Sequence, residues 1–231
     1  MFLKRAFFVI SALFLLPSLV LASNSEWRRV ARTEGIQVFA RDVEGSRVRE
    51  VKAVARIEAP PGRVLAVLAD IEAYPETMPY TELARTVKSE GNSTWMYTVI
   101  NAPLVSRRDY CIKVTFARLP NGTLRYSWEP ANELAPAESP GVRVEINQGH
   151  WLLRPVDGGN ATQAEYYIYT DPGGEIPVFV ANRANNTAVP DVVKHVRAAA
   201  ASPRYANAMH PIAAPPAPAP EESSADEDDS D

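Results

Sequence analysis

The chain has 231 residues, of which 46% are hydrophobic and 23% charged, and its formal net charge at neutral pH is −4. No run of basic residues is longer than two, which argues against binding to nucleic acid. Cys111 is the only cysteine, so no internal disulfide can form and the core has to hold by packing alone.

The first residues have the pattern of a signal peptide over 1–22. A basic start is followed by an apolar run from 6 to 21, which ends in the small residue Ala22 before Ser23. The alternative is an uncleaved membrane anchor, but Pro17 interrupts the run, and a span needs about 20 apolar residues. The pattern therefore predicts an exported protein, periplasmic or secreted if the host is bacterial.

The other end of the chain, residues 206–231, is rich in Pro and Ala and then in acidic residues. Its last 21 residues hold seven of the 28 acidic residues, which leaves the rest of the mature chain close to neutral. Such a segment cannot bury enough apolar area to offset its chain entropy, so we expect a disordered tail. One folded domain is predicted between them, over 23–205.

The predicted elements of this domain begin with a short helix over 26–32, where Trp27, Val30 and Ala31 share one side. Alternation of apolar and polar residues over 36–40 and 51–57 then indicates two antiparallel strands.

A helix is predicted to start at Pro60-Pro61, and residues 70–80 are expected to be irregular. The alternation resumes near Leu83, and Asn121-Gly122 is a strong hairpin signal. About eight strands joined mostly by short turns, with separate helices, indicate an α+β fold with a curved antiparallel sheet. The further alternating runs cover 95–100, 110–116, 123–128, 142–147, 151–153 and 164–168.

A Pro-Gly-Gly turn at 171–177 should end the last strand and lead into a helix over 176–200. The expected apolar face of this helix carries Asn182 and Asn185, and burying an unpaired amide costs about 1–3 kcal/mol. Pro190 should bend the helix. The pattern is typical of a helix that covers a cavity, although its first half could instead extend into solvent.

At this point the chain resembles the START family of lipid-transfer domains, which have the helix-grip fold. The resemblance covers about residues 25–203 and rests on the order and spacing of several motifs. It implies a sheet wrapped around the long C-terminal helix, with a tunnel for one lipid and a lid loop at 129–141. The motifs are Gly35-Ile36-Gln37-Val38-Phe39 after Trp27, residues 64–70, Ser106-Arg107-Arg108-Asp109-Tyr110, residues 149–155, and residues 171–177.

The chain departs from the sterol-binding members of that family. Those members carry a buried arginine–acid pair, but Val114 stands where the arginine is expected, and the strand over 95–100 has no acid. Asp109 is interpreted as part of a strand-surface ion pair with Arg108.

We therefore expect a non-enzymatic protein that binds and transfers one lipid or similar hydrophobic molecule. No catalytic residue, metal ligand set or cofactor motif is recognised. We also expect transient membrane contact, a monomer, and a cover made by the 129–141 loop and the first half of the last helix. The candidate ligand contacts are Tyr74, Met78, Trp95, Tyr97, Tyr126, Trp151, Phe179, Asn182 and Arg183.

Two other interpretations stay open. Helix-grip relatives include polyketide cyclases and aromatases, which also enclose apolar substrates, but such an enzyme needs a polar pair over the substrate. The sequence offers only Arg183 and scattered tyrosines for that role. The third interpretation is a binding module that docks a partner through the acidic tail.

Overall fold

The computed structural model describes residues 26–103 and 105–214, without the side chains of 178–186. Its strands are β1 (Arg28–Thr33), β2 (Ile36–Arg41), β3 (Glu50–Ile57), β4 (Thr81–Glu90), β5 (Ser93–Ile100), β6 (Arg108–Arg118), β7 (Leu124–Pro130), β8 (Val142–Arg143), β9 (Ile146–Val156) and β10 (Ala161–Asp171). Its α-helices are α1 (Pro61–Ala69), α2 (Tyr74–Thr77) and α3 (Val178–Ala201). The 3₁₀ turns are η1 (Ile71–Ala73), η2 (Asn132–Leu134), η3 (Asp157–Gly159), η4 (Pro203–Tyr205) and η5 (Pro211–Ala213).

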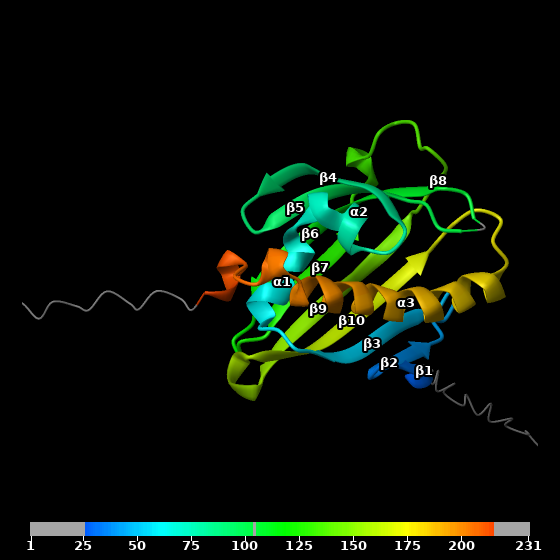
Figure 1. The fold of residues 1–231 in the computed structure, drawn as a ribbon. Helices are drawn as coiled ribbons and strands as arrows, with labels where there is room; N and C mark the ends of the chain where they lie inside the picture. The colour runs from blue at the N-terminus through cyan, green and yellow to red at the C-terminus, as the bar shows by residue number, and fades with distance from the viewer. Residues whose placement is uncertain (1–25, 104, 215–231) are drawn as a thin grey trace, which may run out of the picture.

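The ten strands form one sheet in the order β1-β2-β3-β10-β9-β7-β6-β5-β4, and β8 pairs with β6 outside this path. Every pairing is antiparallel except that of β8 with β6. The sheet curves, and α3 lies across its concave side (Figure 1). This arrangement confirms the predicted α+β helix-grip architecture.

The local sequence explains where these elements begin and end. Pro61 occupies the first turn of α1, where its missing N–H is no loss, and the buried stripe of α1 includes Val64 and Leu68. Gly173 and Gly174 have φ values of 66° and 67°, so the turn after β10 depends on left-handed backbone that glycine adopts easily. The predicted turn before the last helix is therefore confirmed.

The predicted helix over 26–32 is wrong, because the residues from Arg28 onward form β1 instead. Glu34 and Gly35 have φ values of 48° and 74°, and two successive positive φ angles are typical of a tight hairpin turn. This turn pairs Thr33 with Ile36 and carries β1 back along β2. The sheet edge thus overrides a helical spacing that only three apolar residues supported.

The apolar residues form two cores on opposite faces of the sheet. The larger core fills the space between the concave face, α1 and α3, and includes Leu65, Leu153 and Val193. The smaller core lies on the outer face and is made by Tyr97, Val99, Cys111 and Ala131. Strand alternation in β5 and β6 supplies side chains to both cores.

The described fold continues past residue 205, where the domain was predicted to end. His210 donates its backbone N–H to the Gly62 carbonyl at 3.1 Å, and its ring stacks on Phe116 at 4.7 Å. Arg118 donates hydrogen bonds to the carbonyls of Ala213 and Ala214. The segment up to residue 214 therefore packs on α1 and β6.

Candidate functional site: an aromatic chamber under the last helix

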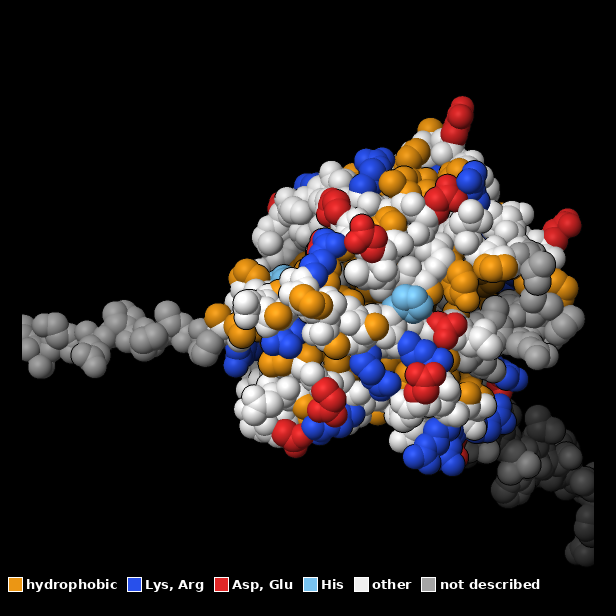
Figure 2. Space-filling model, viewed as in Figure 1, with side chains coloured by type: hydrophobic (Ala, Val, Ile, Leu, Met, Phe, Trp, Pro, Cys, Tyr) orange, Lys and Arg blue, Asp and Glu red, His pale blue; other side chains and the backbone are white. Residues whose placement is uncertain are grey.

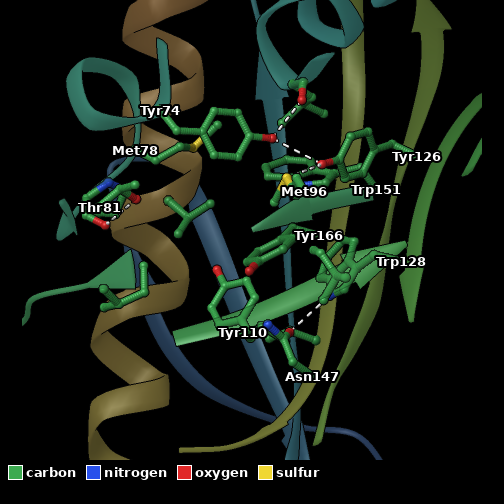
Figure 3. Close-up of a pocket in the computed structure, with 16 residues that line it drawn as sticks. Tyr74, Met78, Thr81, Met96, Tyr110, Tyr126, Trp128, Asn147, Trp151 and Tyr166 are labelled. Carbon is green, nitrogen blue, oxygen red and sulfur yellow. Dashed lines mark hydrogen bonds between the residues drawn. The ribbon is translucent and has the colours of Figure 1, made fainter. Parts of the chain in front are cut away.

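A chamber of about 140 Å³ lies between the concave face of the sheet, α2 and the middle of α3 (Figure 3). No Asp, Glu, Lys or Arg is found among its described lining residues. The lining residues are Leu68, Tyr74, Met78, Pro79, Thr81, Met96, Ile100, Tyr110, Ile112, Tyr126, Trp128, Asn147, Trp151, Tyr166, Ile168 and Val192. A concave, mainly apolar and aromatic space is the usual form of a site for a hydrophobic small molecule.

An aromatic row crosses four strands of the concave face, and three of its rings line the chamber. The strand register places Tyr166 opposite Trp151, Trp151 opposite Tyr126, and Tyr126 opposite Phe116. The rings of Trp151 and Tyr166 stack at 4.6 Å, and those of Phe116 and Tyr126 meet edge to face at 5.4 Å. Such ring pairs add stability beyond their buried area, so the row forms a well-defined apolar wall.

Gly149 gives the chamber room for the indole of Trp128. A Cβ atom at this position would lie 2.4 Å from Trp128 Cζ2 and 2.2 Å from the Tyr167 carbonyl oxygen. Because no side chain is present, the indole crosses β9 and its Nε1–H donates a 3.0 Å hydrogen bond to Asn147 Oδ1. This bond orients the Asn147 amide beside the chamber.

Two tyrosine hydroxyls in the chamber are bonded to protein atoms. The Tyr74 hydroxyl donates to the Leu68 carbonyl at 2.6 Å and lies 3.1 Å from the Tyr126 hydroxyl. Burial, together with the neighbouring Tyr126, holds the pKa of Tyr74 well above its ordinary value. These phenols therefore stay neutral, and they close one end of the chamber without a charge.

The Tyr110 hydroxyl interacts with the side chains of Thr98 and Asn147, whereas the Tyr166 hydroxyl has no hydrogen-bond partner among the described residues. Burial raises the pKa of Tyr110 to about 12, although Thr98 and Asn147 act in the opposite direction. Burial also raises the pKa of Tyr166, as do Tyr110 and Tyr126. Both groups are therefore neutral O–H donors that face the chamber.

The predicted contact residues divide into three groups. Tyr74, Met78, Tyr126 and Trp151 line the chamber, and their contact with a ligand stays a prediction. Trp95 and Tyr97 do not line it, because β5 turns Met96 and Ile100 inward instead. The side chains of Phe179, Asn182 and Arg183 lie outside the described residues.

The two misplaced aromatic residues have clear roles on the outer face of the sheet. The Lys88 and Lys113 ammonium groups lie 4.8 and 5.4 Å from the ring centroid of Trp95. The Tyr97 hydroxyl donates to Asp109 at 2.9 Å. Sequence alternation alone does not say which face of a strand turns inward when both faces carry large apolar residues, as in β5.

The interpretation of Asp109 as part of a surface ion pair with Arg108 is wrong. The Asp109 side chain has an exposed fraction of 0% and accepts two hydrogen bonds from Arg143, at 3.0 and 2.9 Å. Ser139 also donates to it, at 2.6 Å. Arg108 lies on the opposite face, since successive strand residues alternate. The true partner is far away in sequence and is brought close by the pairing of β8 with β6.

The loop at 129–141 lies on the outer face as well, so the expectation that it covers the chamber is wrong. Asn132 accepts from the Cys111 N–H at 2.9 Å and donates to the Val144 carbonyl at 2.9 Å. Arg143 also donates to the Pro136 carbonyl at 2.7 Å. These bonds fix the loop to β6 behind the chamber, and no loop residue is among the described lining residues.

The described residues include no group of three or more His, Cys, Asp or Glu side chains that could hold a metal ion. Val114, at the position of the missing sterol-type arginine, is completely buried in the larger core. The described polar atoms of the chamber are therefore hydroxyl, amide and thioether groups, which suit hydrogen bonding better than metal binding.

Comparison with known proteins agrees with this site. Residues 57–197 match the family model described as polyketide cyclase / dehydrase and lipid transport. The chain belongs to this family. A relative in Pseudomonas aeruginosa, an uncharacterized protein, is 28% identical over 180 residues, which are 78% of this chain and 89% of that protein.

Solved structures of StAR-related lipid-transfer proteins have the same fold. The protein of that description from Xanthomonas axonopodis is 27% identical, with a TM-score of 0.72, and the match covers 76% of this chain and 99% of that one. Human STARD10 is 19% identical, with a TM-score of 0.67 over 75% of this chain and 72% of that one. This chain thus has the START helix-grip fold.

Proposed function

We propose that this protein is an exported, non-enzymatic carrier that binds one lipid or similar hydrophobic molecule in the chamber and transfers it. The partly open aromatic chamber, with no charged side chain among its described lining residues, is the observation that carries the proposal. Exposing an apolar chain to water costs about 0.8 kcal/mol for each CH₂ group, so a carrier has to shield it. The fold shared with lipid-transfer proteins supports the same conclusion.

The size of the chamber limits what it can hold without moving. Its 140 Å³ is close to the roughly 150 Å³ of an apolar cavity that admits benzene, whereas sites for larger ligands have roughly 300–1,000 Å³. A long acyl chain therefore requires the walls to separate. Met78 and Val192 line the chamber from the α2 side and from α3, so separation between them would enlarge it.

An enzyme of the cyclase or aromatase type is the second candidate, because the family description names cyclases and dehydrases as well as lipid transport. A catalyst of this kind needs an acid and a base whose pKa values suit proton transfer near neutral pH. The described chamber offers tyrosines with raised pKa values, such as Tyr110, and the Asn147 amide. This set favours binding over turnover.

Lipid extraction tests the carrier function directly. The protein is purified from its host compartment, its lipids are extracted and identified by mass spectrometry, and uptake of fluorescent lipids is measured in parallel. A carrier should yield one class of hydrophobic molecule in a fixed ratio to protein. Reproducible absence of any lipid, together with no uptake, would exclude this function, and conversion of the bound molecule would favour the enzyme.

Export rests on residues 1–22, which lie outside the described residues. Within the described part of the chain, no helix is both long and apolar enough to span a bilayer. We expect N-terminal sequencing of the mature protein to begin at Ser23. An intact leader would instead indicate a retained anchor. Transient membrane contact and a monomeric state complete the proposal, since a carrier loads and unloads its ligand at a membrane.

A further inference from the structure

Arg108 lies next to the chamber and has no acidic partner among the described residues. It precedes Tyr110 on the same face of β6, and its cross-strand neighbour on β5 is Ile100; both neighbours line the chamber. Only 8% of Arg108 is exposed. Burying a charge without a counter-charge is unfavourable, so a buried unpaired guanidinium calls for an explanation.

The guanidinium is held only by backbone carbonyls in the described structure. Its Nε donates to the Pro172 carbonyl at 3.3 Å, and its Nη1 donates to the Ser106 carbonyl. No acid offsets the effect of burial, which lowers the pKa of Arg108. Asp109, next to Arg108 in the chain, binds Arg143, and Asp171, next to Pro172, binds Arg47 at 2.9 and 3.0 Å.

The turn after β10 brings Gly174, which has no side chain, next to the Arg108 guanidinium. A Cβ atom at Gly174 would lie 3.9 Å from Arg108 Nη2, which has no hydrogen-bond partner among the described residues. The same turn leads into α3 at Val178, and the N-terminal end of a helix carries partial positive charge. Both features favour an anion near Nη2.

The polar groups on this side of the chamber complement one another. Tyr166 presents an O–H donor without an acceptor among the described residues, and Tyr110 adds a hydroxyl beside Asn147. Arg108 adds a cation one pleat beyond Tyr110, at about 7 Å along the strand. The rings of Tyr126, Trp151 and Tyr166 supply an apolar and aromatic surface. We propose that the ligand is an amphiphile with an anionic carboxylate or phosphate head group, which Arg108 binds, and an apolar body in the chamber.

This inference rests on the proposed carrier function and names its ligand class. The test compares tetradecanoate with tetradecan-1-ol, which share one chain and differ in head charge, using equilibrium dialysis and the fluorescence of Trp128 and Trp151. Tetradecanoyl lysophosphatidate tests a phosphate head on the same chain. Inorganic phosphate, added as a competitor, separates a lipid head group from free phosphate.

We expect the wild-type protein to bind the acid at least about tenfold more tightly than the alcohol, since bonds to charged groups are the strong ones. Arg108→Gln should bring the two affinities within about twofold of each other, whereas Arg108→Lys should keep part of the preference. Arg125→Gln, which makes the same charge change at an exposed position of β7, should retain the full preference.

Each other outcome has a distinct meaning. Equal affinity of the wild-type protein for acid and alcohol overturns the anionic head group but leaves the carrier function intact, and this comparison does not depend on any variant folding. A preference for the acid that persists in Arg108→Gln assigns the anion to another residue. Binding of inorganic phosphate that does not compete with the lipids rejects a shared head-group site. Failure to bind any of the amphiphiles contradicts the carrier function itself.

Discussion

The carboxylate of Asp109 shows how one buried charge can hold several segments together. It receives hydrogen bonds from Tyr97 on β5, from Ser139 in the loop and from Arg143 on β8. We expect Asp109→Asn to lower the free energy of unfolding by about 3 kcal/mol, because it leaves the partly buried Arg143 without a counter-charge. Urea denaturation measures the change.

The matched control for this prediction is Asp42→Asn. Asp42 pairs with Arg28 at 2.6 Å, but their side chains are 52% and 67% exposed, so this change should leave the free energy of unfolding nearly unchanged. Equal losses in the two variants would contradict the structural role given to Asp109.

The stability of the protein should also depend on pH through Asp109. Burial alone would raise the pKa of this carboxyl group, but the bonds from Arg143, Ser139 and Tyr97 outweigh burial and hold it below the ordinary value of 3.8. A lowered folded-state pKa contributes stability above the unfolded-state value and loses it as pH falls through the folded-state value. The free energy of unfolding should therefore fall below about pH 4, and less steeply in Asp109→Asn.

Gly149 allows a second prediction at this scale. Gly149→Ala places a methyl group against Trp128 and the Tyr167 carbonyl, so we expect it to destabilise the fold by about 3 kcal/mol and to change the tryptophan emission. Gly91→Ala is the control: no atom lies within 4 Å, and only its φ of 57° opposes a side chain. A loss no larger than in this control, about 1 kcal/mol, would contradict the close approach of the indole.

The two faces of each strand have different functions, and two neighbouring residues of β10 allow them to be tested separately. Ile168 lines the chamber, whereas the hydroxyl of Tyr169 donates to Ser46 on the outer face at 2.8 Å. We expect Ile168→Trp to fill the chamber and reduce lipid uptake at least about tenfold while the protein stays folded. Tyr169→Trp should leave uptake unchanged. Normal uptake by Ile168→Trp would place the ligand elsewhere.

The strands and helices differ in how well the sequence predicts them. Alternation and the Asn121-Gly122 turn predict β6 and β7 well, because one face of each strand is clearly apolar. The predicted helix over 26–32 is wrong because the Glu34-Gly35 turn is a stronger signal, for a hairpin, than the spacing of three apolar residues is for a helix. The inward face of β5 could not be predicted, because Tyr97 packs in one core and Met96 in the other.

The site itself was predictable only in part. Tyr126 and Trp151 were recognised as candidate contacts because they lie on alternating strands, but their alignment in one row depends on a register set by distant pairings. Tyr110 and Tyr166 were missed as lining residues, since the sequence does not show which strand residues face the chamber. The burial of Arg108 beneath the turn after β10 likewise depends on tertiary structure.

For the molecule as a whole, the C-terminal boundary of the fold can be tested by truncation. Removal of residues 215–231 should leave stability and lipid uptake unchanged. Removal of everything after Tyr205 deletes the bond of His210 to Gly62 and its stacking on Phe116, so we expect a loss of about 2 kcal/mol in urea denaturation. Equal stability of both truncated proteins would show that the segment up to residue 214 contributes nothing. Loss of a partner interaction when only residues 215–231 are removed would support docking through the acidic tail.

The face that carries α3 shows basic and acidic side chains interspersed, without one dominant sign (Figure 2). Broad electrostatic attraction is therefore a weak way to orient this face toward an anionic surface. Recognition of a charged head group would depend instead on local contacts such as those of Arg108.

The second core behind β5 and β6 has a mechanical consequence. Asn132 and Arg143 form hydrogen bonds across this core, so the β5–β6 part of the sheet is stiffened from its outer face. Expansion of the chamber for a long ligand must then occur on the concave side, by movement of α3 and of the segment near Met78. The rigidity of the outer-face core, which the ligand does not contact, would thus determine that the ligand enters from the side of α3.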